Sequence, residues 1–476
     1  MELPAWELGT RIRDRVLRPS EVVEAALDRI RAWDGGYLAF NTVTGAEALA
    51  RAEELDREEP RGLLHGIPVG IKDNFHTAGV RTTANSWIFQ DFVPEADATA
   101  VARLGEAGAV AVGKTQMGPL ATTRALTPDG EITTVSAWAP DDPSVSPGGS
   151  SSGSATAVAG RMITAATGTQ TGGSITVPAL AQGLTGLKPT MGRVSLRGVI
   201  PLTYTRDHPG PLARDARDAA LLLQAMAGPD PADPRTLGLP PVPDYLLPVS
   251  PPEEPGRPFL RWPTRLGVLP GWADRDGEVG HARRRFLRTM EELGVRLVQV
   301  ALPPAWEELT SPAFNDVRLP ERSEPFLEHL RKDVRLFGVA LSPWINGLLM
   351  SGDEYLKGQR AKLALLRLVL VDLFRECDVV VQDGHVPFDM IGLPLIAFPV
   401  GMVRNRGREL PTGVLLGGLP FGEERLLSVA AAWQWATDWH TRRPPEPAWR
   451  QEARVPGVGD GSRGRLGVEE VAERAQ

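Results

Sequence analysis

Residues 147–154 read PGGSSSGS, and residues 168–175 read GTQTGGSI. Each stretch places a serine directly after two glycines, Ser150 in the first and Ser174 in the second, and the two serines are 24 residues apart. Glycine has no Cβ and accepts tight turns, so the backbone N–H groups of such a loop can point toward one place. These stretches therefore indicate loops that present a serine hydroxyl together with backbone amides.

The residues around these loops predict an α/β fold. Residues 69–72 and 109–112 are short apolar runs that predict buried strands, and residues 97–108 predict a helix between them. Residues 154–159 are mostly small and predict a closely packed helix. Alternating strands and helices are typical of a sheet covered by helices on both faces. We expect one large domain, because no clean linker separates the motifs.

The bulk composition is that of an ordinary globular protein, with 476 residues, 42% of them hydrophobic and 23% charged. The net charge of -7 argues against a nucleic-acid partner, which requires a basic face. Cys377 is the single cysteine, so no internal disulfide can form, which fits a reducing compartment. No signal peptide is evident, and the apolar residues 363–374 are too short to span a bilayer. We expect a cytoplasmic protein without a membrane partner.

Residues 66–74 read GIPVGIKDN and contain a lysine at the close of a predicted strand. An ordinary lysine has a pKa of about 10.4 and is charged at neutral pH. Burial favours the neutral form, which could take a proton from a serine. Lys72 is therefore a candidate base. Its neighbour Asp73 supplies the alternative interpretation, a surface lysine paired to an adjacent carboxylate.

Each of the other motifs also has an alternative interpretation. Residues 148–153 alone would fit a flexible linker, and a serine after Gly-Gly can simply cap a helix. Residues 149–153 match Gly-x-Ser-x-Gly, but a nucleophile elbow needs an apolar strand before it, and here prolines and aspartates precede it. His208 sits in a turn context and reads as structural or pocket-lining. Residues 108–115 match the spacing of a phosphate-binding loop, but residues 109–112 favour a strand.

The serine and lysine motifs, in this order, closely resemble the amidase signature family, whose members hydrolyse amide bonds with a Ser-Ser-Lys triad. Further similar segments are RTTANS at 81–86, VGKT at 112–115, GLKPT at 186–190, GPLAR at 210–214 and, more weakly, GLPLIAFPVG at 392–401. The resemblance implies a single domain with a central mixed β-sheet covered by helices. It also implies an enzyme that needs no metal or organic cofactor, and no metal-ligand pattern is evident in the sequence.

The resemblance assigns roles to individual residues. Ser174 would be the nucleophile, Ser150 the relay that carries its proton, and Lys72 the neutral base. The Gly149–Ser150 peptide bond would be cis. The backbone amides expected to hold the oxyanion are those of Thr171, Gly172, Gly173 and Ser174.

Two departures from the family pattern bear on the substrate. The amidotransferase members usually carry arginine two residues after the nucleophile, where this chain has Thr176, and residues 116–120 read QMGPL in place of the usual NMDEF. Both changes remove charge, so we expect a weakly polar acyl or aryl amide, with carbamates and esters as further substrates. The expected substrate-binding residues are Met117, Ala121, Ser151 and Thr176. Core packing is an equally good interpretation of Met117 and Leu120.

We expect residues 1–455 to form the amidase domain, with residues 229–385 as the variable part that shapes the pocket, and residues 456–476 to form a flexible tail. The expected partner is a small-molecule amide, and a homo-oligomer is compatible with the sequence. Two other functions stay open. One is that of the A subunit of a glutamine-dependent amidotransferase, and the other is that of a non-catalytic binding homologue.

Overall fold

Eleven strands lie side by side in one mixed sheet within the described chain, which comprises residues 1–250, 260–405 and 407–447 of a computed structural model. Their order across the sheet is β1 (Phe40–Val43), β3 (Val110–Thr115), β2 (Pro68–Lys72), β4 (Ala165–Gln170), β6 (His208–Ala213), β5 (Thr185–Lys188), β10 (Leu395–Asn405), β11 (Arg408–Gly418), β9 (Val379–Gln382), β7 (Arg265–Val268) and β8 (Arg296–Gln299). Strand β2 is parallel to β3 and β4, and β7 is parallel to β8 and β9. The other neighbours are antiparallel. The expected α/β domain with a mixed sheet is confirmed.

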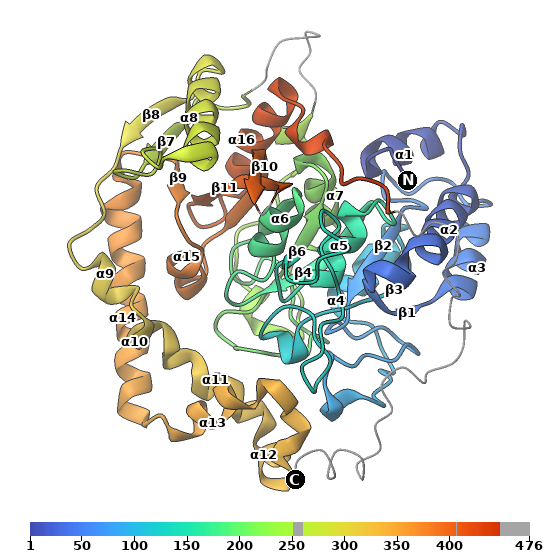
Figure 1. The fold of residues 1–476 in the computed structure, drawn as a ribbon, viewed down its shortest axis with the longest axis horizontal. Coiled ribbons are helices and arrows are strands. Elements are labelled where there is room, and N and C mark those ends of the chain that lie inside the picture. Colours follow the sequence, from blue (N-terminus) through green and yellow to red (C-terminus); the bar gives the residue numbers. More distant parts are fainter. Residues whose placement is uncertain (251–259, 406, 448–476) are drawn as a thin grey trace.

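Helices flank this sheet (Figure 1). The α-helices are α1 (Ala5–Arg13), α2 (Pro19–Tyr37), α3 (Gly45–Leu55), α4 (Thr99–Glu106), α5 (Ser152–Ala159), α6 (Thr176–Gln182), α7 (Ala216–Met226), α8 (Gly277–Glu292), α9 (Trp306–Leu309), α10 (Pro312–Asn315), α11 (Leu319–Ser323), α12 (Leu327–Lys332), α13 (Leu341–Leu349), α14 (Gly352–Val371), α15 (Val386–Ile391) and α16 (Glu423–Ala436). Helix α5 packs on β2 and β4, α6 on β5 and β10, and α7 on β5 and β6. The loops that lead into α5 and α6 are the two serine motifs.

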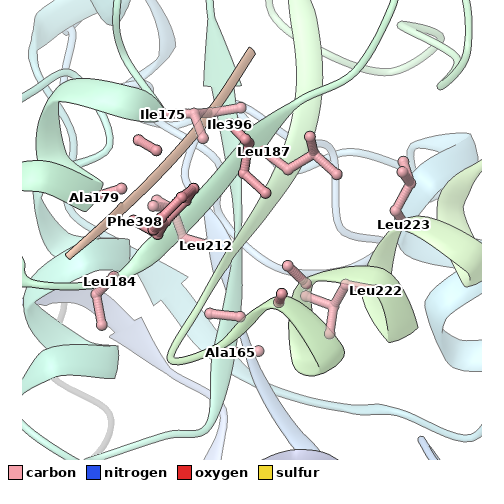
Figure 2. Packing of buried hydrophobic residues seen from close by; sticks show 14 of the residues in the cluster. Ala165, Ile175, Ala179, Leu184, Leu187, Leu212, Leu222, Leu223, Ile396 and Phe398 are labelled. Carbon is pink, nitrogen blue, oxygen red and sulfur yellow. The ribbon is translucent and has the colours of Figure 1, made fainter. Parts of the chain in front are cut away.

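The main hydrophobic core lies between the sheet and these helices. Figure 2 shows Ala179 of α6 and Leu222 and Leu223 of α7 on opposite sides of the strand residues Leu187 and Leu212. All of these side chains are buried. Burying apolar side chains on both faces of the sheet is the main stabilising contribution to such a fold.

Small residues bring helix α5 very close to its neighbours. All eight of its residues, SGSATAVA, are buried. A Cβ on Gly153 would lie 2.3 Å from the carbonyl oxygen of Ala39, so no side chain fits at that position. Strands β2 and β3 and helices α4 and α5 occupy the segments for which the sequence predicts them, and these predictions are confirmed.

Residues 229–385, which we expect to be the variable region, contribute β7–β9 and helices α8–α14. Helices α9–α14 lie along one side of the molecule, apart from α5 and α6 (Figure 1). A second buried apolar cluster joins residues of this region, including Phe326, Phe337 and Trp344, to Met117, Leu120 and Ala121. Residues 456–476, for which we expect a flexible tail, lie outside the described residues.

In the described ranges no single helix is long and apolar enough to cross a membrane. Residues 334–349 and 352–375 reach that threshold only when taken together, and they are bent by 98° at the break between them.

Candidate active site

Lys72 ends strand β2, and its side chain turns into the interior of the protein. Its Nζ lies 2.9 Å from Ser150 Oγ, 2.7 Å from Thr169 Oγ1 and 3.3 Å from the Thr169 carbonyl oxygen. The lysine and Ser150 are both buried. Burial lowers the pKa of Lys72 to about 7, although the charge of Asp207 acts in the opposite direction. Near neutral pH a large fraction of this lysine is therefore free to accept a proton.

Asp73 points away from Lys72 and belongs to a different buried group. Its carboxylate lies 3.6 Å from Lys114 Nζ and accepts hydrogen bonds from Asn41 Nδ2 at 2.8 Å and from the Thr83 backbone N–H at 3.0 Å. Successive side chains of a strand project to opposite faces, which separates the two neighbours. The alternative interpretation of Lys72 as a surface residue paired to Asp73 is therefore wrong.

The relay loop around Ser150 is held by contacts to other loops. The Gly149–Ser150 peptide bond is cis, as expected. The Ser150 carbonyl oxygen accepts a hydrogen bond from the Gly118 N–H at 3.0 Å. A Cβ on Gly149 would lie 2.5 Å from the Thr123 carbonyl oxygen, so the approach of these two loops requires glycine. The loop is ordered by specific contacts and is not a linker.

The hydroxyls of the two serines after Ser150 donate hydrogen bonds to backbone carbonyl oxygens. Ser151 Oγ donates to the carbonyl oxygen of Ser174 at 2.6 Å, and Ser152 Oγ donates to that of Gly148 at 2.6 Å. Both residues are fully buried. The Ser151 hydroxyl therefore ties the Ser150 loop to the loop of Ser174, which we call the nucleophile loop after the role expected for that serine. This bond occupies the hydroxyl that we expected to contact substrate.

Ser174 lies between β4 and α6, in a loop that turns at Gly173 with a φ of +85°. Glycine adopts such a conformation without the strain that a side chain would add. Among the described residues the Ser174 hydroxyl has no hydrogen-bond partner, and Ile175 is the residue at the cap position of α6. The hydroxyl is therefore not a helix cap.

The four amides expected to bind the oxyanion are not equivalent. In the described chain the N–H groups of Thr171, Gly172 and Ser174 donate to no protein acceptor. The N–H of Gly173, in contrast, donates to Asp389 Oδ2 at 2.9 Å. We expected the Gly173 N–H to bind the oxyanion. This expectation is wrong, because that N–H already donates its hydrogen bond to the Asp389 carboxylate. Three amides of the loop remain available.

Asp389 is a positioning residue that the sequence did not reveal. Besides Gly173, it accepts hydrogen bonds from Gln170 Nε2 at 2.8 Å and His385 Nδ1 at 2.8 Å, and Lys188 Nζ lies 3.9 Å away. Burial acts to raise the pKa of Asp389, but the hydrogen bond from His385 and the charge of Lys188 outweigh it, so this pKa lies below its ordinary value. The carboxylate is thus charged and fixed beneath the nucleophile loop. The sequence feature that could have identified Asp389 is an acidic residue within the otherwise apolar helix α15.

Gln170 ties the same loop together from the inside. Its Oε1 accepts from the backbone N–H groups of Ile175 and Thr176, both at 2.9 Å, and from Thr176 Oγ1 at 3.1 Å. The Thr176 side chain is buried and engaged in the protein. We expected Thr176 to bind substrate, but its hydroxyl holds the loop instead.

Asp207 supports the other end of the loop. It accepts a hydrogen bond from Thr171 Oγ1 and two more from the backbone N–H groups of Leu202 and Thr203, at 2.8 and 3.0 Å. Burial raises the pKa of Asp207 above its ordinary value, against these hydrogen bonds. Asp207 and Asp389 therefore hold the loop on either side of Gly172, which is exposed.

The remaining residues that we expected near the site are buried parts of the structure. Met117 and Ala121 are buried in the second apolar cluster, so the structure places them in core packing beside the Ser150 loop. His208 is buried, and burial lowers its pKa to about 3. This histidine is neutral and fits the structural interpretation. Within the described residues no group of three or more His, Cys, Asp or Glu side chains could hold a metal ion.

The sequence profile of the amidase family matches residues 21–383. The chain belongs to this family, and it is an amidase-signature enzyme that acts on carbon–nitrogen amide bonds.

Relatives of two kinds are similar to this chain. The A subunit of the glutamyl-tRNA(Gln) amidotransferase of Geobacter metallireducens is 35% identical over 93% of this chain and 99% of its own length. The solved peptide amidase of Stenotrophomonas maltophilia has a TM-score of 0.78 and 29% identity, covering 94% of this chain and 98% of its own. The solved A subunit of the glutamyl-tRNA(Gln) amidotransferase of Thermotoga maritima has a TM-score of 0.65 and 27% identity, covering 87% and 90%.

Proposed function

We propose that this protein hydrolyses an amide through an acyl-enzyme on Ser174, with Ser150 as the relay and Lys72 as the base. The contact of 2.9 Å between Lys72 Nζ and Ser150 Oγ is the observation that supports this most strongly. A lysine whose pKa is lowered to about 7 can accept a proton that an ordinary lysine cannot.

We propose the following proton path, which the contact between Lys72 and Ser150 supports. Ser174 transfers its proton to Ser150, whose own proton passes to Lys72, and Ser174 Oγ forms a bond to the carbonyl carbon. The amides of Thr171, Gly172 and Ser174 stabilise the negative oxygen, a contribution that in other enzymes is worth about 2.7–4 kcal/mol per donor. The proton returns through the relay to the nitrogen as the C–N bond breaks. Water then cleaves the ester by the same route in reverse.

The substrate that we propose has a weakly polar acyl or aryl group next to the scissile carbonyl. The Thr176 hydroxyl is bound to Gln170, and no cation projects from the position where the amidotransferase members carry arginine. Carbamates and esters present a similar carbonyl and are further candidate substrates. We also propose that the enzyme is cytoplasmic and that it requires no cofactor.

The alternative function is that of the A subunit in an amidotransferase assembly, since relatives bearing that name are 35–36% identical to this chain. Such a protein would release ammonia from a donor amide in the presence of its partners. Co-purification of partners and preferential turnover of glutamine would favour this alternative. A single species that turns over neutral anilides with a higher kcat/KM than glutamine would favour the amidase.

Covalent labelling tests the proposed function directly. A fluorophosphonate should label the protein once, and peptide mapping should place the label on Ser174. The Ser174→Ala variant should not be labelled. Ser144, which is exposed and outside both serine motifs, serves as the control position for a Ser144→Ala variant that labels normally. A label mainly on Ser150 or another residue would overturn the assignment of the nucleophile.

A further inference from the structure

Two buried arginines lie beside the nucleophile loop and have no role in the proposed proton path. Arg206 precedes Asp207 in the loop before β6, and Arg322 lies in helix α11 of the variable region. Their exposed fractions are only 3% and 8%. Arginines are rarely buried to this extent without a paired anion.

Within the described residues neither guanidinium forms an ion pair with a carboxylate. Arg206 Nη1 donates to Asn315 Oδ1 at 2.7 Å, and Arg322 Nε lies 3.4 Å from Thr203 Oγ1. In the described chain neither arginine has a carboxylate oxygen within 4.0 Å. A guanidinium has five N–H donors, so most donors of both groups have no protein acceptor.

The position of the two groups relates them to the loop of Ser174. The charge of Asp389 acts on Arg206, and the charge of Asp207 acts on Arg322. These two aspartates are the ones that contact Gly173 and Thr171. The arginines therefore lie where the nucleophile loop meets the variable helices.

The N–H donors of Arg206 and Arg322 that no described residue accepts favour an anion at this place. Burial and the neighbouring Arg318 lower the pKa of Arg206 to about 10 and that of Arg322 to about 9. Arg318 itself is paired with Asp316 at 2.8 Å. Asp389 and Asp207, whose charges act on Arg206 and Arg322, are already hydrogen-bonded to the loop of Ser174 and form no ion pair with either arginine among the described residues. A carboxylate matches the planar fork of a guanidinium and would supply the missing acceptors.

We propose that Arg206 and Arg322 bind a free carboxylate of the substrate, at a distance from the scissile bond. This inference rests on the proposed function and narrows it to amides with a weakly polar group at the reacting carbonyl and an anionic end. Half-amides of dicarboxylic acids are the simplest members of this class. Free glutamine differs from them, because its ammonium group would be repelled by the same arginines.

Matched substrates test the proposal. The 4-nitroanilides of succinic, glutaric and adipic acid are compared with the methyl-terminated anilides of equal chain length. For at least one chain length, the wild-type kcat/KM should be about tenfold or more higher for the carboxylate anilide than for the methyl-terminated anilide. This is the difference expected for a charge-assisted hydrogen bond. Equal or poorer use of every carboxylate would overturn the proposal.

Variants then assign the preference to the two arginines. In Arg206→Gln and Arg322→Gln the ratio of kcat/KM between carboxylate and neutral anilide should fall by about tenfold, mainly through KM. The control Arg335→Gln removes an arginine of the same region that is 52% exposed and paired with Asp333, and it should keep the wild-type ratio. A ratio unchanged in both buried-arginine variants would contradict the assignment.

Binding to an inactive variant separates this inference from the proposed function. In calorimetric titrations, Ser174→Ala should bind the best carboxylate anilide at least about tenfold more tightly than its neutral partner. Equal affinities would overturn the carboxylate site even if Ser174 were labelled as proposed. Absence of labelling at Ser174, with a clear preference in binding, would instead overturn the mechanism and leave the site intact.

Discussion

The side-chain nitrogen of Lys72 lies 2.9 Å from the hydroxyl oxygen of Ser150, although 78 residues separate them in the sequence. Strand β2 delivers the lysine from one side, and the loop before α5 delivers the serine from the other. Both groups are buried, so the charged form of the lysine is disfavoured by lost hydration. The pair therefore combines hydrogen-bond contact with a pKa suited to proton transfer.

The pH dependence of catalysis should report this lysine. Because the neutral form is the base, kcat/KM should reach a plateau above pH 7 and fall about tenfold for each unit below the pKa of about 7. A pH profile on a neutral anilide measures the midpoint. Asp207→Asn should move it to lower pH, because the charge of Asp207 raises the pKa of Lys72. A flat profile between pH 5 and pH 9 would contradict the role of Lys72.

Replacement of Lys72 should affect amides more than esters. In Lys72→Ala the leaving nitrogen can no longer receive its proton through the relay, so kcat/KM for an amide should fall about 10²–10⁴-fold. The matched ester should lose less, since its leaving group needs that proton less. Circular dichroism checks that the variant is folded. Equal losses of kcat/KM on both substrates would contradict the proton-transfer role and leave Lys72 with a structural role only.

Asp389 should control both the shape of the nucleophile loop and the stability of the protein. Asp389→Ala leaves the Gly173 N–H, Gln170 and Lys188 without their shared acceptor, and loss of one partner from a buried charged group costs about 3–5 kcal/mol. We expect a lower midpoint of urea unfolding and a slower rate of fluorophosphonate labelling.

Asp389→Asn is the conservative variant for the same position, because it keeps one acceptor oxygen. It should recover part of the labelling rate at a stability closer to that of the wild type. If Asp389→Ala were labelled at the wild-type rate, Asp389 would not position the loop.

The Asp73–Lys114 pair should be important for stability and should act as a unit. Lys114→Met leaves the buried Asp73 carboxylate unpaired and should reduce the free energy of unfolding by about 3–5 kcal/mol. The double variant Asp73→Asn/Lys114→Met should be more stable than the sum of the single changes predicts. Urea denaturation of the four proteins measures this coupling, and strict additivity would show that the two groups are energetically independent.

Local patterns in the sequence were sufficient for the strands β2 and β3 and for helix α5, whereas the resemblance of the serine and lysine motifs to a known family selected Lys72, Ser150 and Ser174. The hydrophobic pattern and the glycine positions act over a few neighbouring residues, so they can be interpreted without knowledge of the fold.

The tertiary structure alone decided which way the neighbours Lys72 and Asp73 turn, and that Asp389 occupies the Gly173 amide from 216 residues away. It also placed Met117 in the core, whereas the sequence was compatible with both substrate binding and core packing. Such contacts depend on how the strands pair and the helices pack, and no local pattern records them. The sequence by itself therefore determined which groups are available for chemistry, whereas packing determined which of them meet, because burial and long-range hydrogen bonds exist only in the folded chain.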